Sequence, residues 1–123
     1  MKYPINILLI ERNLILINHL KEQFEQDKEL HLIGTSSDGK QIMEFVEKNI
    51  VDVIVMDYLQ TNGLVLTDLI SKKFPNIKII GFSTEDGCHS KRVLQLGATV
   101  YLSKFETNLE QLITGIKRCH WEE

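Results

Sequence analysis

The chain has 123 residues, of which 43% are hydrophobic and 25% are charged, with a formal net charge of −3 at pH 7. This is the size and composition of one globular domain that can bury a core without disulfides or metals. The acidic balance gives no broad basic surface for nucleic acid, no apolar run is long enough to cross a bilayer, and the N-terminus is no signal peptide. We therefore expect a cytosolic protein that does not bind membranes.

Short apolar runs of strand length recur along the chain. Runs that do not alternate with polar residues are typical of strands covered on both faces, as in parallel sheets. The predicted strands are residues 7–10, 30–34, 53–56, 77–82 and 99–103. Each is followed by a stretch with the periodicity of a helix.

These helical stretches carry apolar residues three and four positions apart. In chain order the stripes are Leu16, Leu20 and Phe24; Ile42, Phe45, Val46 and Ile50; Leu66, Leu69, Ile70 and Phe74; and Leu109, Leu112, Ile113 and Ile116. A shorter helix is predicted from Ser90 to Leu96, ending at Gly97, and Asp38-Gly39 predicts a turn before the second helix. Strands that alternate with helices predict an α/β fold with parallel pairing and right-handed crossovers.

Polar residues stand where the predicted strands end: Glu11, Arg12, Asp57, Ser83 and Lys104. In such sheets, ligands bind beyond the carboxyl ends of the strands. The Asp57 carboxylate can act as a nucleophile, and the Lys104 ammonium suits a phosphate oxygen. Taken alone, an Asp after a strand is more often a turn or capping residue. Carboxylate, hydroxyl and ammonium on three strand ends together favour an aspartyl-phosphate site.

Five stretches of the chain resemble a bacterial response-regulator receiver domain, most closely that of LuxR/NarL-type transcription regulators. They are INILLIERN, LIGTSSDGKQIMEFV, VDVIVMDY, FPNIKIIGFST and VLQLGATVYLSK, and the resemblance covers residues 5–118. It implies a flavodoxin-like, doubly wound, five-stranded parallel sheet in the order 2-1-3-4-5, with five helices. It also implies that residues 1–123 form one receiver domain, the N-terminal part of a longer regulator whose DNA-binding domain is absent from this chain.

The resemblance implies roles for four residues. Asp57 would be the phosphoacceptor, charged by a sensor histidine kinase, and Lys104 would bind a phosphoryl oxygen. Ser83 would turn towards the phosphoryl group, and the Tyr101 ring would follow it. The fourth helix, fifth strand and fifth helix would form the output surface. A homodimer is expected, and the domain itself is not expected to be an enzyme.

The chain departs from the family at the end of its first strand, where two acids normally help to hold Mg²⁺. Glu11 matches the first acid, but Arg12 replaces the second, which leaves Glu11 and Asp57 as metal ligands. Mg²⁺ needs hard oxygen ligands, and Arg12 and Lys104 cancel the charge of the two remaining acids. The loop DYLQTNG after Asp57 also lacks the usual proline and is shorter than usual. We therefore expect Mg²⁺ to be disfavoured as a cofactor.

Two positions of the Arg12 side chain are open. Its stem can lie over the rim with its head in solvent, or its guanidinium can form an ion pair with Asp57. The charge count favours the ion pair. The expected function is a two-component receiver that regulates an output, with Asp57 as phosphoacceptor and an altered Mg²⁺ dependence. The alternative is a phosphorylation-independent pseudo-receiver that acts as a protein-interaction or dimerisation module.

Two other functions fit the sequence less well. A flavodoxin-like electron carrier would need a phosphate loop rich in Ser, Thr and Gly after the first strand, where this chain has ERNLIL. An aspartate-based hydrolase would need a second acid two residues after Asp57, where this chain has Leu59. Cys88 and Cys119 give no disulfide framework, and Cys119-His120 lacks the spaced partners of a metal site.

Overall fold

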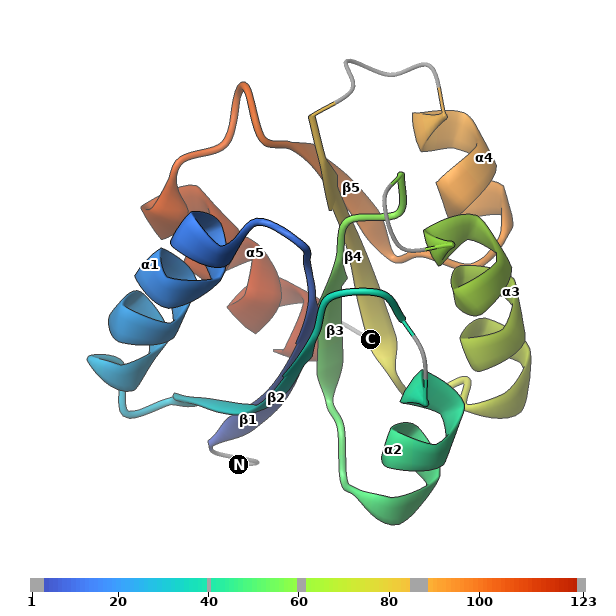
Figure 1. Ribbon diagram of the computed structural model, residues 1–123, viewed down its shortest axis with the longest axis horizontal. Helices are drawn as coiled ribbons and strands as arrows, with labels where there is room; N and C mark the ends of the chain where they lie inside the picture. Colours follow the sequence, from blue (N-terminus) through green and yellow to red (C-terminus); the bar gives the residue numbers. More distant parts are fainter. Residues whose placement is uncertain (1–3, 40, 60–61, 85–88, 122–123) are drawn as a thin grey trace.

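The computed structural model describes residues 4–39, 41–59, 62–84 and 89–121. Five strands and five helices alternate along the chain (Figure 1). The strands are β1 (Ile5–Ile10), β2 (Leu30–Ser36), β3 (Val53–Met56), β4 (Lys78–Ser83) and β5 (Val100–Ser103). The helices are α1 (Leu14–Glu25), α2 (Ile42–Lys48), α3 (Gly63–Lys73), α4 (Ser90–Gln95) and α5 (Leu109–Trp121). None of the helices described is both long and apolar enough to cross a membrane.

The strands form one sheet in the order β2-β1-β3-β4-β5, and all four neighbouring pairs are parallel. This confirms the predicted flavodoxin-like topology. Helices α1 and α5 cover one face of the sheet, and α2, α3 and α4 cover the other (Figure 1). The strand order reverses between β1 and β3, so their carboxyl ends flank the place where such folds bind ligands.

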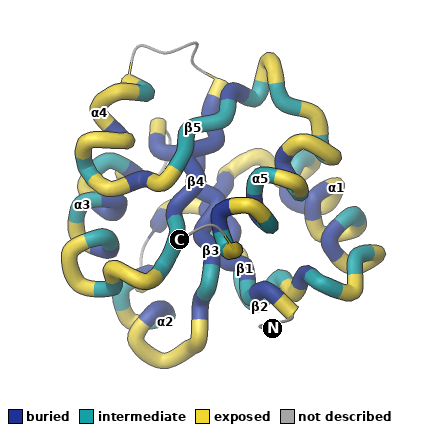
Figure 2. Tube along the Cα trace, turned by 180° about the vertical axis from the view of Figure 1, so that it is seen from behind, coloured by how far each residue is buried: buried dark blue, intermediate teal, exposed yellow. Residues whose placement is uncertain are grey.

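Coverage of both faces explains the unbroken apolar runs. Residues 53–56 of β3 are all fully buried, because successive side chains enter opposite cores. On the α1/α5 side the core contains Ile5, Ile7, Leu9, Leu20, Phe24, Val53, Val55, Ile80, Phe82, Leu112 and Ile116. On the other side it contains Leu8, Ile10, Ile42, Val46, Ile54, Met56, Tyr58, Leu66, Ile70, Ile79 and Val93. Figure 2 shows the central strands as buried segments between helices with exposed outer surfaces.

Two residues of the predicted apolar stripes are exposed: Leu69 of α3, which is 47% exposed, and Ile50. Ile50 was expected to extend the apolar stripe of the second helix, but α2 ends at Lys48 and Ile50 is 78% exposed. Asn49 ends the helix with an extended backbone, and both its backbone N–H and its side-chain amide donate to the carbonyl of Phe45. The chain then runs straight on to Val51, which is buried instead.

The short helix α4 ends as predicted. Gly97 follows it with a φ of +122°, a conformation that a residue with a side chain rarely adopts. A Cβ at this position would also lie 2.3 Å from Cβ of Ser71 in α3. Ser71 Oγ donates to the Leu96 carbonyl at 2.8 Å, so the end of α4 is fixed to α3.

An ion-pair cluster joins α5 to the turn between α1 and β2. Lys117 Nζ lies 2.8 Å from Asp27 Oδ2 and 2.8 Å from Glu29 Oε1. The hydrogen bond from Lys117 lowers the pKa of Asp27 from its usual 3.8, and the hydrogen bonds to Asp27 and Glu29 raise the pKa of Lys117 from 10.5. These shifts mean that the charged forms stabilise the fold.

Replacing Lys117 with Met should lower the free energy of unfolding at neutral pH by about 0.5–1 kcal/mol, because two partly exposed ion pairs are lost. Chemical denaturation measures the change. Lys72→Met is the control: it removes an exposed pair with Asp68, and should cost less than about 0.5 kcal/mol.

The pH dependence of this difference has a defined sign. Asp27 contributes above 3.8, and its contribution is lost as the pH falls through its lowered folded pKa. Lys117 contributes below 10.5, and its contribution is lost as the pH rises through its raised folded pKa. The wild type and Lys117→Met should therefore converge at both extremes. A difference that stays constant in acid would contradict this account.

Candidate functional site

The carboxyl ends of β1, β3 and β5 bring three charged residues together. Glu11 directly follows β1, Asp57 directly follows β3 and Lys104 directly follows β5. Backbone hydrogen bonds carry the sheet pairing past the strand ends: Asp57 N donates to the Ile10 carbonyl at 2.9 Å, and Lys104 N donates to the Ser83 carbonyl at 2.8 Å. The sheet register therefore sets the starting point of each side chain.

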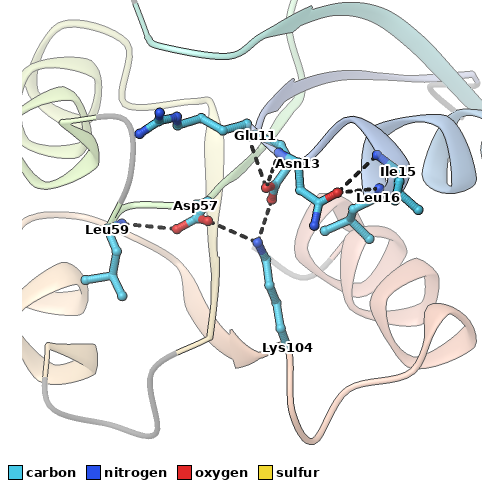
Figure 3. Close-up of polar contacts among 8 residues, drawn as sticks. Glu11, Asn13, Ile15, Leu16, Asp57, Leu59 and Lys104 are labelled. Atoms are coloured by element: carbon cyan, nitrogen blue, oxygen red, sulfur yellow. Dashed lines mark hydrogen bonds and ion pairs between the residues drawn. The ribbon is translucent and has the colours of Figure 1, made fainter.

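Lys104 lies between the two carboxylates (Figure 3). Its Nζ is 2.7 Å from Glu11 Oε1 and 3.0 Å from Asp57 Oδ2. Glu11 is 1% exposed and Asp57 is 2% exposed, so both acids are shielded from bulk water. A buried carboxylate needs a partner of opposite charge to stay ionised at an acceptable cost. One ammonium serves both, and one net negative charge remains in the cluster.

The second oxygen of each carboxylate accepts backbone N–H groups. Glu11 Oε2 accepts from Arg12 N and Asn13 N at 3.1 Å each, and Asp57 Oδ1 accepts from Leu59 N at 3.2 Å. Asn13 then caps α1, since its Oδ1 accepts from the N–H groups of residues 15 and 16. Glu11 thus braces the loop between β1 and α1.

The structure does not place Arg12 against Asp57. The Arg12 side chain is exposed, and it forms no salt bridge with any residue that the structure describes. The predicted Arg12–Asp57 ion pair is therefore not observed, and Lys104 pairs with Asp57 instead. The physical reason is local: both the Arg12 and Asn13 amides turn inward to Glu11 Oε2, while the Arg12 head stays in solvent.

Ser83 ends β4 beside this cluster. It is completely buried, and its Oγ has no hydrogen-bond partner among the residues described. A buried hydroxyl without a partner is uncommon and costs about 1–3 kcal/mol. Ser83 is thus a buried polar group, beside the charged cluster, whose hydroxyl is unsatisfied within the described part of the chain.

Tyr101, the predicted switch aromatic, is half-buried on β5. Its ring meets the ring of Tyr58 edge-to-face, with centroids 5.9 Å apart and an interplanar angle of 68°. Sequence reasoning missed Tyr58, which directly follows Asp57 and is 2% exposed. The available signal was an aromatic residue straight after a buried strand.

The cluster does not fit Mg²⁺ in the usual way. Mg²⁺ prefers several hard oxygen ligands in an octahedral arrangement. Of the residues that the structure describes, two acids form the cluster, and each of their oxygens already accepts from an ammonium or a backbone amide. Within the described ranges, no group of three or more His, Cys, Asp or Glu residues is arranged to hold a metal ion. Residues 60–61 of the shortened loop, and Cys88, lie outside those ranges.

Comparison with known proteins gives a consistent family. The family model of the response regulator receiver domain matches residues 7–117. The transcriptional regulatory protein DegU of Brevibacillus brevis is 29% identical over 116 residues, which is 92% of this chain and 49% of DegU. The response regulator UvrY of Escherichia coli is 32% identical over 104 residues, which is 81% of this chain and 47% of UvrY.

Relatives also include an enzyme. The protein-glutamate methylesterase/protein-glutamine glutaminase 2 of Pseudomonas aeruginosa is 30% identical over 105 residues, which is 82% of this chain and 30% of that protein. The chain thus spans about half or less of the length of these curated relatives. Their complete activities do not transfer to it.

Solved structures show the same fold. The signal receiver domain of the response regulator NarL from Mycobacterium tuberculosis has a TM-score of 0.88 at 14% identity, covering 99% of this chain and 100% of that one. The response regulator domain of Thermotoga maritima CheB has a TM-score of 0.84 at 23% identity, covering 97% and 98%. The family model covers nearly the whole chain and the fold agrees with it, so the chain belongs to the response regulator receiver domain family of two-component signalling.

Proposed function

We propose that Asp57 is the phosphoacceptor of this receiver, and that phosphorylation depends little on Mg²⁺. The observation that carries the proposal is the pairing of buried Asp57 with Lys104 at 3.0 Å. The pair lies at the carboxyl ends of the strands, where the strand order reverses. A carboxylate oxygen of Asp57 would attack the phosphorus of the donor. The new O–P bond would form as the bond from phosphorus to the leaving group breaks, and the leaving group would keep that electron pair.

Neighbouring residues support the two other roles. Lys104 would move from the carboxylate to a phosphoryl oxygen, where an ammonium stabilises developing negative charge. Ser83 Oγ, which lacks a partner among the described residues, would gain an acceptor from the same group. Satisfying this buried hydroxyl would favour the phosphorylated state by about 1 kcal/mol or more.

Arg12 would act after, rather than before, phosphorylation. An aspartyl phosphate carries about 1.5–2 negative charges at neutral pH, in place of the single charge of the free carboxylate. With Glu11 and Lys104 unchanged, the net charge of the cluster goes from −1 to about −1.5 to −2, which favours the approach of another cation. Arg12 is exposed at the rim and one residue from Glu11, and a guanidinium can bind a phosphoryl group in bidentate fashion. This gives a reason for an arginine at this position that does not require contact with Asp57.

Apolar residues at the rim support docking of a partner that delivers the phosphoryl group, which we propose to be a sensor histidine kinase. Leu14 is 71% exposed, Ile15 is 83% exposed and Phe105 is 73% exposed. Single exposed apolar residues are ordinary. These three, however, belong to the first turn of α1 and to the segment directly after Lys104, which both border the site.

The second candidate is the phosphorylation-independent pseudo-receiver. The double ion pair of Lys104 favours it, because Asp57 already has a cation beside it without phosphate or metal. Such a domain would act through protein contacts alone. In either case, we propose that the whole protein forms a homodimer. It would regulate transcription through a DNA-binding domain outside this chain.

Incubation with acetyl phosphate should add one phosphoryl group to the chain, because the Asp57 carboxylate already has the Lys104 ammonium beside it. Intact mass spectrometry measures the adduct in Mg²⁺ and in EDTA. We expect similar yields in both. Asp57→Asn is the matched control and should show no adduct.

Two outcomes contradict this proposal in different ways. An adduct that needs Mg²⁺ and disappears in Asp57→Asn would mean that Asp57 is an ordinary metal-dependent acceptor. No adduct under either condition, and none from a phosphorylated histidine kinase, would leave the pseudo-receiver.

Changing Arg12 to Asp should create a metal site, because it restores the second acid of the family pattern. The affinity for Mn²⁺ should rise roughly tenfold or more relative to wild type. Electron paramagnetic resonance measures it, because the signal of the free ion is lost on binding. Arg12→Ala is the control: it removes the positive charge but adds no ligand, and should bind clearly less tightly than Arg12→Asp. Equal affinity in the two variants would show that ligand number is not the limiting factor.

A further inference from the structure

Tyr58 belongs to the core under α3 and α4, although it directly follows Asp57. It is 2% exposed. The chain therefore turns at the acceptor: the Asp57 side chain lies in the charged cluster, while the next side chain lies in an apolar core. One peptide unit connects two environments that differ completely in polarity.

Two glycines enclose Tyr58. A Cβ at Gly81 of β4 would lie 3.1 Å from Cδ1 of the Tyr58 ring, so the ring rests directly on the strand backbone. The same Cβ would lie 3.4 Å from Cγ1 of Val93, which places α4 next to this ring. A Cβ at Gly63, the first residue of α3, would lie 2.2 Å from Cα of Tyr58. Tyr58 thus has little room to move independently of β4 and α3.

The outer side of the Tyr58 ring meets Tyr101. Tyr101 is the sheet partner of Gly81, and its ring packs edge-to-face on Tyr58 with a centroid separation of 5.9 Å. Aromatic pairs in this geometry contribute beyond simple burial. Tyr101 is half-buried, whereas Tyr58 is enclosed. The outer ring can therefore change position, and the inner ring limits which positions are open to it.

We propose that Tyr58 is a positioning residue that couples the charge state of Asp57 to Tyr101 and α4, in parallel with Ser83. Protein interiors are close-packed, so a displacement of the backbone at Asp57 must move the Tyr58 ring or strain it. Tyr58 then displaces Tyr101 and Val93, which contact it or lie beside it on neighbouring elements. This route needs no hydroxyl. It depends on charge and packing at Asp57, not on phosphorylation, so it is independent of the proposed function.

The test uses the complete chain labelled with 3-fluorotyrosine. The three tyrosines give separate ¹⁹F resonances, and Tyr101→Phe assigns that of Tyr101. The probe is Asp57→Asn, which removes the charge and keeps the shape. The measured quantity is the shift of the Tyr101 resonance on Asp57→Asn, in the wild-type background and in Ser83→Ala, Tyr58→Phe and Tyr58→Leu.

We expect a clear shift in the wild type that is retained in Ser83→Ala and in Tyr58→Phe, which keeps the ring. In Tyr58→Leu the shift should fall to less than half. A second variant, Gly81→Ala, covers the case in which Tyr58→Leu does not fold, since the added methyl displaces the Tyr58 ring from β4 and should also reduce the response. Two results would overturn the proposal: no shift in the wild type, or a shift that persists at full size in Tyr58→Leu, whatever its size in Ser83→Ala.

Discussion

Two carboxylates are buried at the carboxyl edge of this sheet, and a single ammonium lies between them. The cation offsets a large cost, because moving an unpaired charge out of water takes several kcal/mol even after relaxation. Lys104 therefore holds the ends of β1 and β3 in a fixed relation to the end of β5. The other oxygens of the two carboxylates bind the amides of Arg12 and Asn13 in the loop before α1 and the amide of Leu59 after β3.

The same arrangement sets the net charge of the buried cluster. With Arg12 in solvent, the buried charges do not cancel, as they would if both basic residues faced the acids. One negative charge remains, so repulsion alone does not exclude a cation. Among the residues that the structure describes, only two acidic side chains face Lys104, and each of their oxygens already accepts at least one hydrogen bond. The chemistry of the site is thus governed by ligand number and by Lys104, more than by net charge.

Much of the fold was predictable, because long apolar runs with helical stretches between them leave few topologies. The residues at the strand ends followed from the same reasoning, as Asp57, Ser83 and Lys104 converge once the sheet forms. The direction of Arg12 was not predictable from composition. It depends on a carboxylate one residue earlier that turns back to accept the amides of residues 12 and 13. A count of charged residues gives their number and sign, but not which carboxylate oxygens already accept hydrogen bonds.

Two further differences have similar causes. Ile50 continued an apolar periodicity, but the preceding Asn49 ended the helix through its side chain, and periodicity carries no information about such competition. In the sequence, Tyr58 is simply the residue after the strand-end Asp57. In the structure, its ring occupies space that Gly81 and Gly63 leave open. That space comes from two other elements, so no local pattern reveals it.

The charged cluster also has a consequence for how the domain assembles. Lys104 and Glu11 are separated by 93 positions in the sequence, and Lys104 and Asp57 by 47. Contacts between such distant residues close long loops and tend to form late. In a partly folded chain without β5, the two acids at the carboxyl ends of β1 and β3 would lack their cation, and burying them would be unfavourable. Completion of the last strand is therefore favoured by charge as well as by apolar burial, and the charged cluster forms only when the whole sheet does.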